Sequence, residues 1–367
     1  MSHIDLDLCR LAPTEDSALH MNSSSQQQTD EVTTSVVNRR HWFGLPMTEP
    51  KEGTLGEIME SLPHFGRQPF AIPSVNGDEV GVNRYVDVVY RMGTRQGEKT
   101  IPVGVVSKNY RLIDHQQVLT TIEQALIANN IDIKQVSVTA NWTVHGERAH
   151  FSILFPDEEQ FLHSVDNDGD KMRFRIEIFN SVDGSSRLMA VAGWLRFVCS
   201  NGLIVGSSLM DLRRQHRQQL QIEELGTLLR GTIQSVARDK SIFACWNSQP
   251  INSLALTSWA DADVKEQWGV KAAVRVLGIA RTGHDVAVTG DMKRPPSEIP
   301  TKQLGEVPGI HGPVKNIFEI SQVLSWLAGQ RAETAEDLEW RSSVPELIDK
   351  LRKGTRPVNE HLSFENK

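Results

Sequence analysis

The chain has 367 residues, of which 39% are hydrophobic and 23% charged, values that are ordinary for a globular protein with a sizeable core. No apolar run reaches the roughly 18 residues needed to span a bilayer, and the N-terminus lacks the features of a secretory signal. The three cysteines are widely spaced, which argues against a disulfide framework. We therefore expect a cytoplasmic protein with no membrane segment.

The first predicted element follows a long polar stretch. Residues 1–53 are rich in Ser, Thr and Gln without hydrophobic periodicity, which predicts a disordered N-terminal tail. A helix is predicted from Leu55, because Thr54 and Glu57 have the spacing of a capping box and apolar residues recur at helical intervals. Pro63 ends this helix.

A β-rich region follows. Alternating or apolar runs predict strands at 84–91, 101–107, 133–144, 149–155 and within 173–205. The first two form a hairpin, and a helix with Asp114 as its N-cap separates them from the rest. Residues 54–240 are therefore expected to form an α+β domain, an antiparallel β-meander with packed helices.

The hydrophobic period becomes helical from Ser207, which predicts a helix that continues through 233 with a break or kink near Gly226 and Gly231. Residues 241–367 are expected to form a helical C-terminal region. Its predicted helices lie near 260–282, 314–330 and 333–353, and a Pro/Gly-rich loop lies near 283–313.

Charge is unevenly distributed along the chain. The net charge is −7, yet residues 171–217 hold eight Lys or Arg residues against three acids. A basic segment within an acidic chain favours a face that meets a polyanion. Cations at a solvated helix end, together with strand arginines paired to acids elsewhere, would give the same count, so both interpretations stay open.

Catalytic and metal sites receive little support. Asp166, Asp168 and Asp170 alternate as in a calcium loop, but Gly169 falls at the fourth position and not at the sixth, where the sharp turn belongs. Cys199 lies in an apolar run with no local histidine signature, which predicts an inert, buried thiol. The sequence also lacks phosphate-binding glycine loops. We expect no metal, no cofactor and no catalytic residue.

Nucleic acid is the expected partner. Aromatic residues interleave with the basic ones, and an antiparallel sheet can present rings that stack on bases beside cations that contact phosphates. Tyr110 is the candidate for stacking, and the last three cations of the following set are placed in the predicted helix after Ser207. The expected contacts are Lys108, Tyr110, Arg111, Arg173, Arg175, Arg187, Arg213, Arg214 and Arg217.

Two turns near these strands are rich in residues that tolerate a positive φ, which predicts structural corners. Their residues are Asn180, Ser181, Asp183, Gly184, Asn201 and Gly202.

Three motifs follow one another in the chain: Gly104-Val-Val-Ser-Lys-Asn-Tyr-Arg, Asn180-Ser-Val-Asp-Gly-Ser-Ser and Phe197-Val-Cys-Ser-Asn-Gly-Leu. Over roughly residues 60–240 the chain resembles the phage/plasmid-like protein family labelled domain of unknown function 932. It departs from that pattern at Val182, where members often carry a polar or aromatic residue. The resemblance implies a bacterial mobile genetic element as the context, but no activity.

The expected function combines these observations. The chain is interpreted as a DNA-binding accessory protein that binds or anneals single strands in recombination or repair, as a monomer or a homo-oligomer and without catalysis. A protein-interaction or assembly module is the alternative. A metal-dependent hydrolase using Asp183 and Asn201 ranks third.

Overall fold

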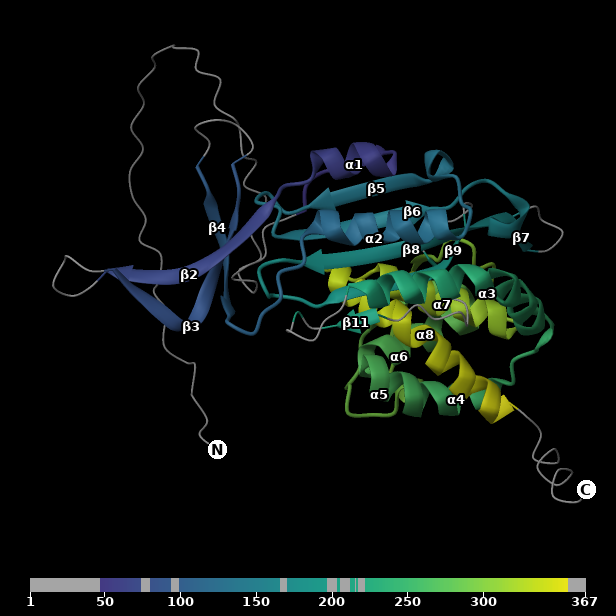
Figure 1. Ribbon diagram of the computed structural model, residues 1–367. Coiled ribbons are helices and arrows are strands. Elements are labelled where there is room, and N and C mark those ends of the chain that lie inside the picture. The colour runs from purple at the N-terminus through teal and green to yellow at the C-terminus, as the bar shows by residue number, and fades with distance from the viewer. Residues whose placement is uncertain are drawn as a thin grey trace, which may run out of the picture. The chain divides into compact units, whose positions relative to one another are not determined.

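The structure, a computed structural model, is shown in Figure 1. It describes residues 47–73, 80–93, 99–165, 170–196, 203–204, 212–214, 216 and 222–355. The predicted α+β class is confirmed, since antiparallel sheets and helices build this part of the chain. Among the described residues there is no helix with the length and apolarity needed to cross a membrane.

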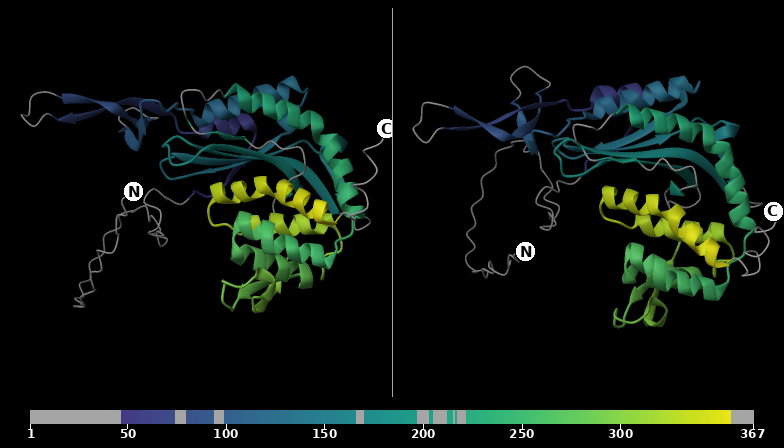
Figure 2. Two further views of the ribbon diagram at one scale, coloured as in Figure 1. Left: turned by 90° about the horizontal axis from the view of Figure 1, so that it is seen from below. Right: turned by 60° about the horizontal axis from the view of Figure 1, so that its bottom comes forward.

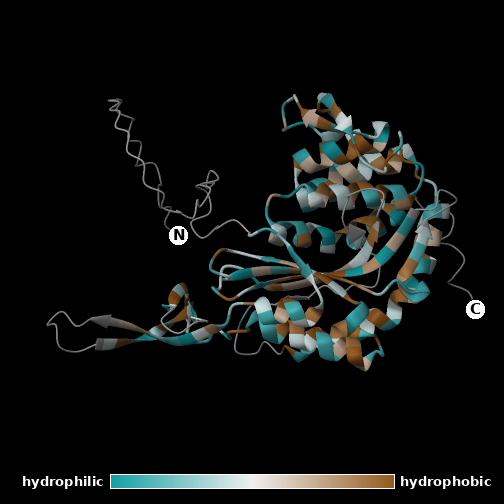
Figure 3. Ribbon diagram, turned by 90° about the horizontal axis from the view of Figure 1, so that it is seen from above, coloured by the Kyte–Doolittle hydropathy of each residue, from teal (hydrophilic) through white to brown (hydrophobic). Residues whose placement is uncertain are grey.

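The largest sheet, which we call the main sheet, is antiparallel, with strand order β1-β5-β6-β8-β9-β10; β7 also pairs with β8, and β11 with β9. Its strands carry alternating hydrophobic and hydrophilic residues (Figure 3). On β8 this alternation buries Phe174, Ile176 and Ile178 on one face. The strands are β1 (Lys51–Gly53), β5 (Ser137–Trp142), β6 (Arg148–Leu154), β7 (Leu162–Val165), β8 (Asp170–Ser181), β9 (Leu188–Arg196), β10 (Leu203–Ile204) and β11 (Leu212–Arg214).

Helices cover both faces of the main sheet (Figure 2). One face meets α1 (Leu55–Ser61), α2 (His115–Ala128) and α3 (Glu223–Ser248), while α8 (Thr334–Thr355) packs against β8 and β9 from the other side. The predicted caps are confirmed: Thr54 forms a capping box with Glu57, and Asp114 forms one with Gln117. These reciprocal bonds satisfy backbone N–H groups that a helix start would otherwise leave unpaired.

The C-terminal region is mainly helical, as predicted. It contains α4 (Ser253–Trp259), a π-helical turn (Ala260–Val264), α5 (Lys265–Trp268), α6 (Val270–Thr282) and α7 (Ile317–Gly329), followed by α8. Short 3₁₀ turns occur at Ile133–Gln135, Glu159–Phe161 and Pro296–Glu298.

A second antiparallel sheet, which we call the three-stranded sheet, has the order β2-β3-β4. Its strands are β2 (Phe65–Pro73), β3 (Val80–Arg91) and β4 (Ile101–Ser107). The predicted hairpin is confirmed as β3–β4, whose register runs from Val86 opposite Ser107 to Arg91 opposite Ile101.

Two predicted assignments are wrong because a distant partner decides the local structure. Leu212–Arg214 forms strand β11 and not the predicted helix, because it pairs with Leu188–Ala190 at the edge of the main sheet. The predicted loop at 283–313 contains a hairpin of β12 (His284–Val288) and β13 (Thr301–Glu306). This hairpin packs on α6 through Val286, whose side chain occupies the space where a Cβ on Gly278 would stand.

The predicted segment boundaries also differ from the structure. Strand β1 lies within the predicted tail, where its three residues pair with β5. The boundary predicted between 240 and 241 falls inside α3.

Candidate functional site

The structure brings the first two sequence motifs together. A Cβ on Gly104 of β4 would fall 2.7 Å from the Cα of Asp183, so the two backbones are in direct contact. The hydroxyl of Tyr110 donates a hydrogen bond to the carbonyl oxygen of Ser181 at 3.1 Å. The third motif lies outside the described residues apart from Leu203, which begins β10.

The turn between β8 and β9 is held by its own polar groups. Asp183 Oδ1 accepts hydrogen bonds from the hydroxyls of Ser181 and Ser185 and from the Ser185 backbone N–H at 3.0 Å. Gly184 has a φ of +80°, which favours glycine. Asn180 Nδ2 donates to the carbonyl of Ile113 at 3.0 Å. These side chains are engaged within the corner, and the predicted turn residues Asn201 and Gly202 lie outside the described residues.

Two buried histidines complete this corner. His115 is fully buried, and its Nε2 donates to the carbonyl of Gly146 at 2.7 Å while Nδ1 accepts from Asn180 Nδ2 at 2.9 Å. This pairing requires the neutral imidazole with its proton on Nε2. Burial lowers the pKa of His115. Sequence reasoning missed this residue, although the spacing of His115, Val118 and Leu119 places it on the buried stripe of α2.

His216 packs on the other side of Tyr110. The two rings are stacked at 5.2 Å between centroids, and His216 Nδ1 donates to the carbonyl of Arg111 at 3.2 Å. Burial lowers the pKa of His216 to about 4, so its ring is neutral at physiological pH. Tyr110 is only 8% exposed, and burial raises the pKa of its hydroxyl. In this structure Tyr110 therefore stacks on His216 and does not present a free face to a base.

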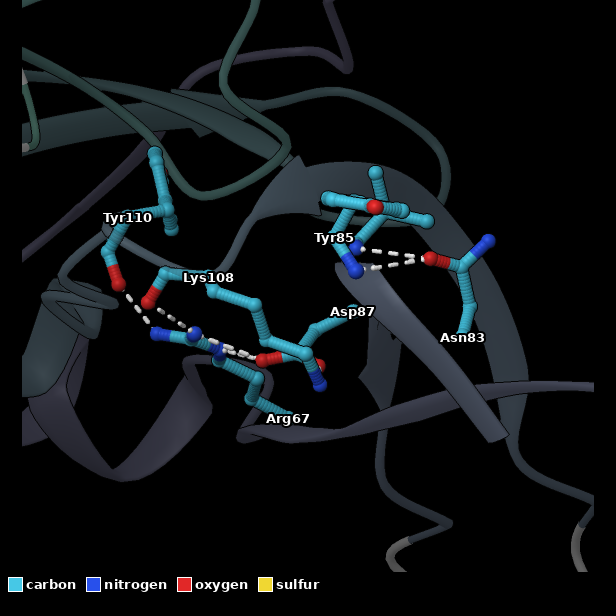
Figure 4. A network of polar contacts seen from close by, with 7 residues as sticks. Arg67, Asn83, Tyr85, Asp87, Lys108 and Tyr110 are labelled. Atoms are coloured by element: carbon cyan, nitrogen blue, oxygen red, sulfur yellow. Dashed lines mark hydrogen bonds and ion pairs between the residues drawn. The ribbon is translucent and has the colours of Figure 1, made fainter.

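Lys108 takes part in an ion-pair cluster with Asp87 of β3 and Arg67 of β2 (Figure 4). Asp87 is buried and pairs with Lys108 Nζ and with Arg67 Nη2, the latter at 2.6 Å. Burial favours a raised pKa for Asp87, but the bonds from Lys108 and Arg67 outweigh it and hold that pKa below its usual value. Arg67 also donates to the backbone carbonyls of Lys108 and Tyr110. This cluster anchors the chain between β4 and α2.

The predicted arginines have different surroundings. On the β8 face opposite Phe174, Arg173 donates to the carbonyl of Phe155, and Arg175 pairs with buried Glu177 at 2.5 Å. Arg187 is exposed in the β8–β9 turn. Arg111 is half-buried, and its backbone forms hydrogen bonds with His216. Arg213 and Arg214 belong to strand β11, and Arg217 lies outside the described residues.

The three-stranded sheet exposes a different set of side chains. Tyr85 is 80% exposed, and Arg84, which precedes it in the sequence, is exposed as well. Val82 and Val105 are also exposed. Asn83 Oδ1 accepts the backbone N–H of Tyr85 at 2.8 Å, which fixes the backbone where the ring emerges (Figure 4). An exposed aromatic ring can stack on a base, and an exposed guanidinium can contact a phosphate.

Neither Tyr85 nor Arg84 is among the nucleic-acid contacts expected from the sequence. The excess of basic over acidic residues around Tyr85 is small, since residues 65–111 hold seven Lys or Arg against four acids.

Comparison with known proteins identifies one matching family model. The model of a family described as Domain of unknown function (DUF932) matches residues 102–282, from β4 to the end of α6. The match includes the corner of Tyr110 and Asp183 but not β2 and β3. No curated protein and no solved structure matches the chain significantly. The resemblance inferred from the three motifs is thus confirmed, because residues 102–282 match the model of the family of the domain of unknown function 932.

Proposed function

We propose that this chain is a cytoplasmic DNA-binding accessory protein of a bacterial mobile genetic element, and that it binds single strands through the three-stranded sheet without catalysing a reaction. The mobile-element context comes from the family resemblance alone. DNA binding is supported by the surface chemistry of β3. In this proposal Tyr85 stacks on a base and Arg84 contacts a neighbouring phosphate.

The observation that carries the proposal is the exposure of Tyr85. Tyr85 is 80% exposed, whereas Tyr110, the residue selected from the sequence, is 8% exposed. A large aromatic side chain that a fixed backbone exposes to water is stabilised when a planar group covers its ring. Bases are such groups, and stacking on an aromatic ring tolerates any base sequence.

Charge supports the same surface. Residues 65–111 carry a basic excess within a chain whose net charge is −7. Asp87, which lies in the middle of β3, is neutralised by Lys108 and Arg67. The Asp87 carboxylate therefore repels a nearby phosphate less than an unpaired carboxylate would.

The test is fluorescence anisotropy with a labelled single-stranded oligonucleotide at about 50 mM salt, where phosphate contacts remain strong. Stacking on one aromatic residue contributes about 1–3 kcal/mol, so Tyr85→Ala is expected to weaken binding by about 5- to 150-fold. Tyr85→Phe keeps the ring and is expected to bind almost as well as the wild type.

Matched controls are available on the helices. Leu254 in α4 is 77% exposed and Lys271 in α6 is exposed, so Leu254→Ala and Lys271→Ala remove comparable surface groups outside the three-stranded sheet. Both controls are expected to bind like the wild type. The proposal fails if the wild type retains no oligonucleotide, or if Tyr85→Ala binds as tightly as the controls.

A protein-interaction module remains the second candidate because two apolar side chains of the same sheet are exposed, Val82 to 60% and Val105 to 57%. In that case Val105→Asp is expected to convert a self-associated protein into a smaller species in light scattering. A wild type that is already monomeric and binds oligonucleotide would favour the DNA proposal instead.

A further inference from the structure

A cavity of about 460 Å³ lies where α2 begins, between the start of β2 and the start of α3. Phe65, Leu112 and Ile222 supply apolar walls. The polar walls come from the N-cap of α2 and from the helix itself: Asp114, Gln116, Gln117, Thr120, Thr121 and Gln124. Phe65 is the first residue of β2, and Leu112 lies in the segment that leads from β4 to α2. The cavity therefore borders the three-stranded sheet.

Part of the polar lining is already used by the protein. Gln117 Oε1 accepts the backbone N–H of Asp114 at 3.0 Å, and the hydroxyl of Thr121 donates to the carbonyl of Gln117 at 2.9 Å. Gln116 and Gln124 differ, because no described residue forms a hydrogen bond with their side-chain amides. Each of these two amides can offer one donor and one acceptor side by side to a ligand.

The lining also indicates the charge of the ligand. It contains the carboxylate of Asp114, and none of the described residues that line the cavity is Lys or Arg. A phosphate would therefore meet a like charge without a compensating cation. A neutral, planar group with paired donors and acceptors fits better, since its faces can contact the apolar walls while its edge meets the amides.

An unstacked nucleobase has these properties. A glutamine amide can bond with the N6 and N7 positions of adenine in a bidentate arrangement, and proteins that bind single strands accept bases turned out of the stack. We propose that this cavity holds one base of the strand that Tyr85 and Arg84 bind, and that it prefers adenine. The inference rests on the proposed function and adds a base preference to it.

The first experiment compares two labelled oligonucleotides, a thymine tract and the same tract with one central adenine. One good bidentate pair discriminates by about 1–3 kcal/mol, so the wild type is expected to prefer the adenine-containing strand by about 5- to 150-fold. The double variant Gln116→Ala/Gln124→Ala is expected to bind both strands equally. Gln267→Ala, which changes an exposed glutamine in α5, is the control and keeps the preference.

A second measurement uses adenosine alone, followed by ligand-observed NMR. Signal broadening with the wild type that disappears in the double glutamine variant supports the cavity even if oligonucleotides are not retained, and the proposed function would then fail separately. Equal binding of both strands, with Tyr85→Ala still weakening binding, overturns the cavity and leaves the proposed function standing. Failure of both adenosine and the oligonucleotides to bind overturns both.

Discussion

The backbone of Gly104 in β4 lies against the backbone of Asp183 in the β8–β9 turn, at a distance that leaves no room for a side chain. A Cβ at position 104 would stand 2.7 Å from the Asp183 Cα and 2.8 Å from its carbonyl oxygen. This contact joins the three-stranded sheet to the main sheet and unites two of the motifs that define the family resemblance. The close approach of the Asp183 backbone therefore explains why position 104 is occupied by glycine.

Replacing this glycine should destabilise the protein. Gly104→Ala forces the backbones apart, because neither contacting atom belongs to a flexible side chain, and overpacking of this kind costs about 1–3 kcal/mol. The matched control is Gly231→Ala in α3, where a Cβ meets no atom within 4 Å. That change should stabilise the helix by about 0.5–1 kcal/mol. Urea denaturation measures both, and equal midpoints for the two variants would refute the prediction.

The buried ring of His216 makes stability depend on pH. Its pKa is lowered to about 4 in the folded protein, whereas an unfolded histidine titrates near pH 6.5. Between these values the unfolded chain binds more protons, so the stabilisation is fully present above about pH 6.5 and is lost as pH falls towards 4. We expect this residue to lower the free energy of unfolding by about 2 kcal/mol between pH 7 and pH 5.

A substitution separates this effect from other titrations. His216→Phe can keep the stack on Tyr110 but cannot take up a proton, so its stability should change less between pH 7 and pH 5 than that of the wild type. It loses the bond to the Arg111 carbonyl, and its stability at pH 7 should therefore be lower. His311→Phe, at an exposed position, is the matched control. An unchanged pH dependence in His216→Phe would rule out this role.

The sequence predicts the elements whose signals are local. The starts of α1 and α2 follow from Thr54 and Asp114, because a capping box lies within four consecutive residues. Strand β11 could not be predicted in the same way, since its partner β9 lies elsewhere in the chain and its own residues also fit a helical stripe. Three-residue β1 gives too short a pattern to be recognised.

The candidate site illustrates the same limit. Tyr85 and Tyr110 both lie near basic residues, and alternation along a strand does not reveal which face another segment covers. Tyr110 is buried by Ser181, which lies 71 residues further along the chain, and by the ring of His216. Among the residues that the structure describes, nothing of this kind covers Tyr85. Exposure, which separates the two tyrosines, thus depends on contacts between distant segments.

Under the proposed function, the salt dependence of oligonucleotide binding identifies which cations contact phosphates. Each neutralised phosphate of a single strand contributes about 0.7 to the slope of log affinity against log salt, so Arg84→Ala should reduce that slope by about 0.7, whatever the base sequence. Arg175→Ala should leave it unchanged, because Arg175 is paired with buried Glu177. Anisotropy titrations at several salt concentrations measure both slopes. A reduced slope only in Arg175→Ala would place the phosphates on β8, as the basic segment at 171–217 had indicated, and not on the three-stranded sheet.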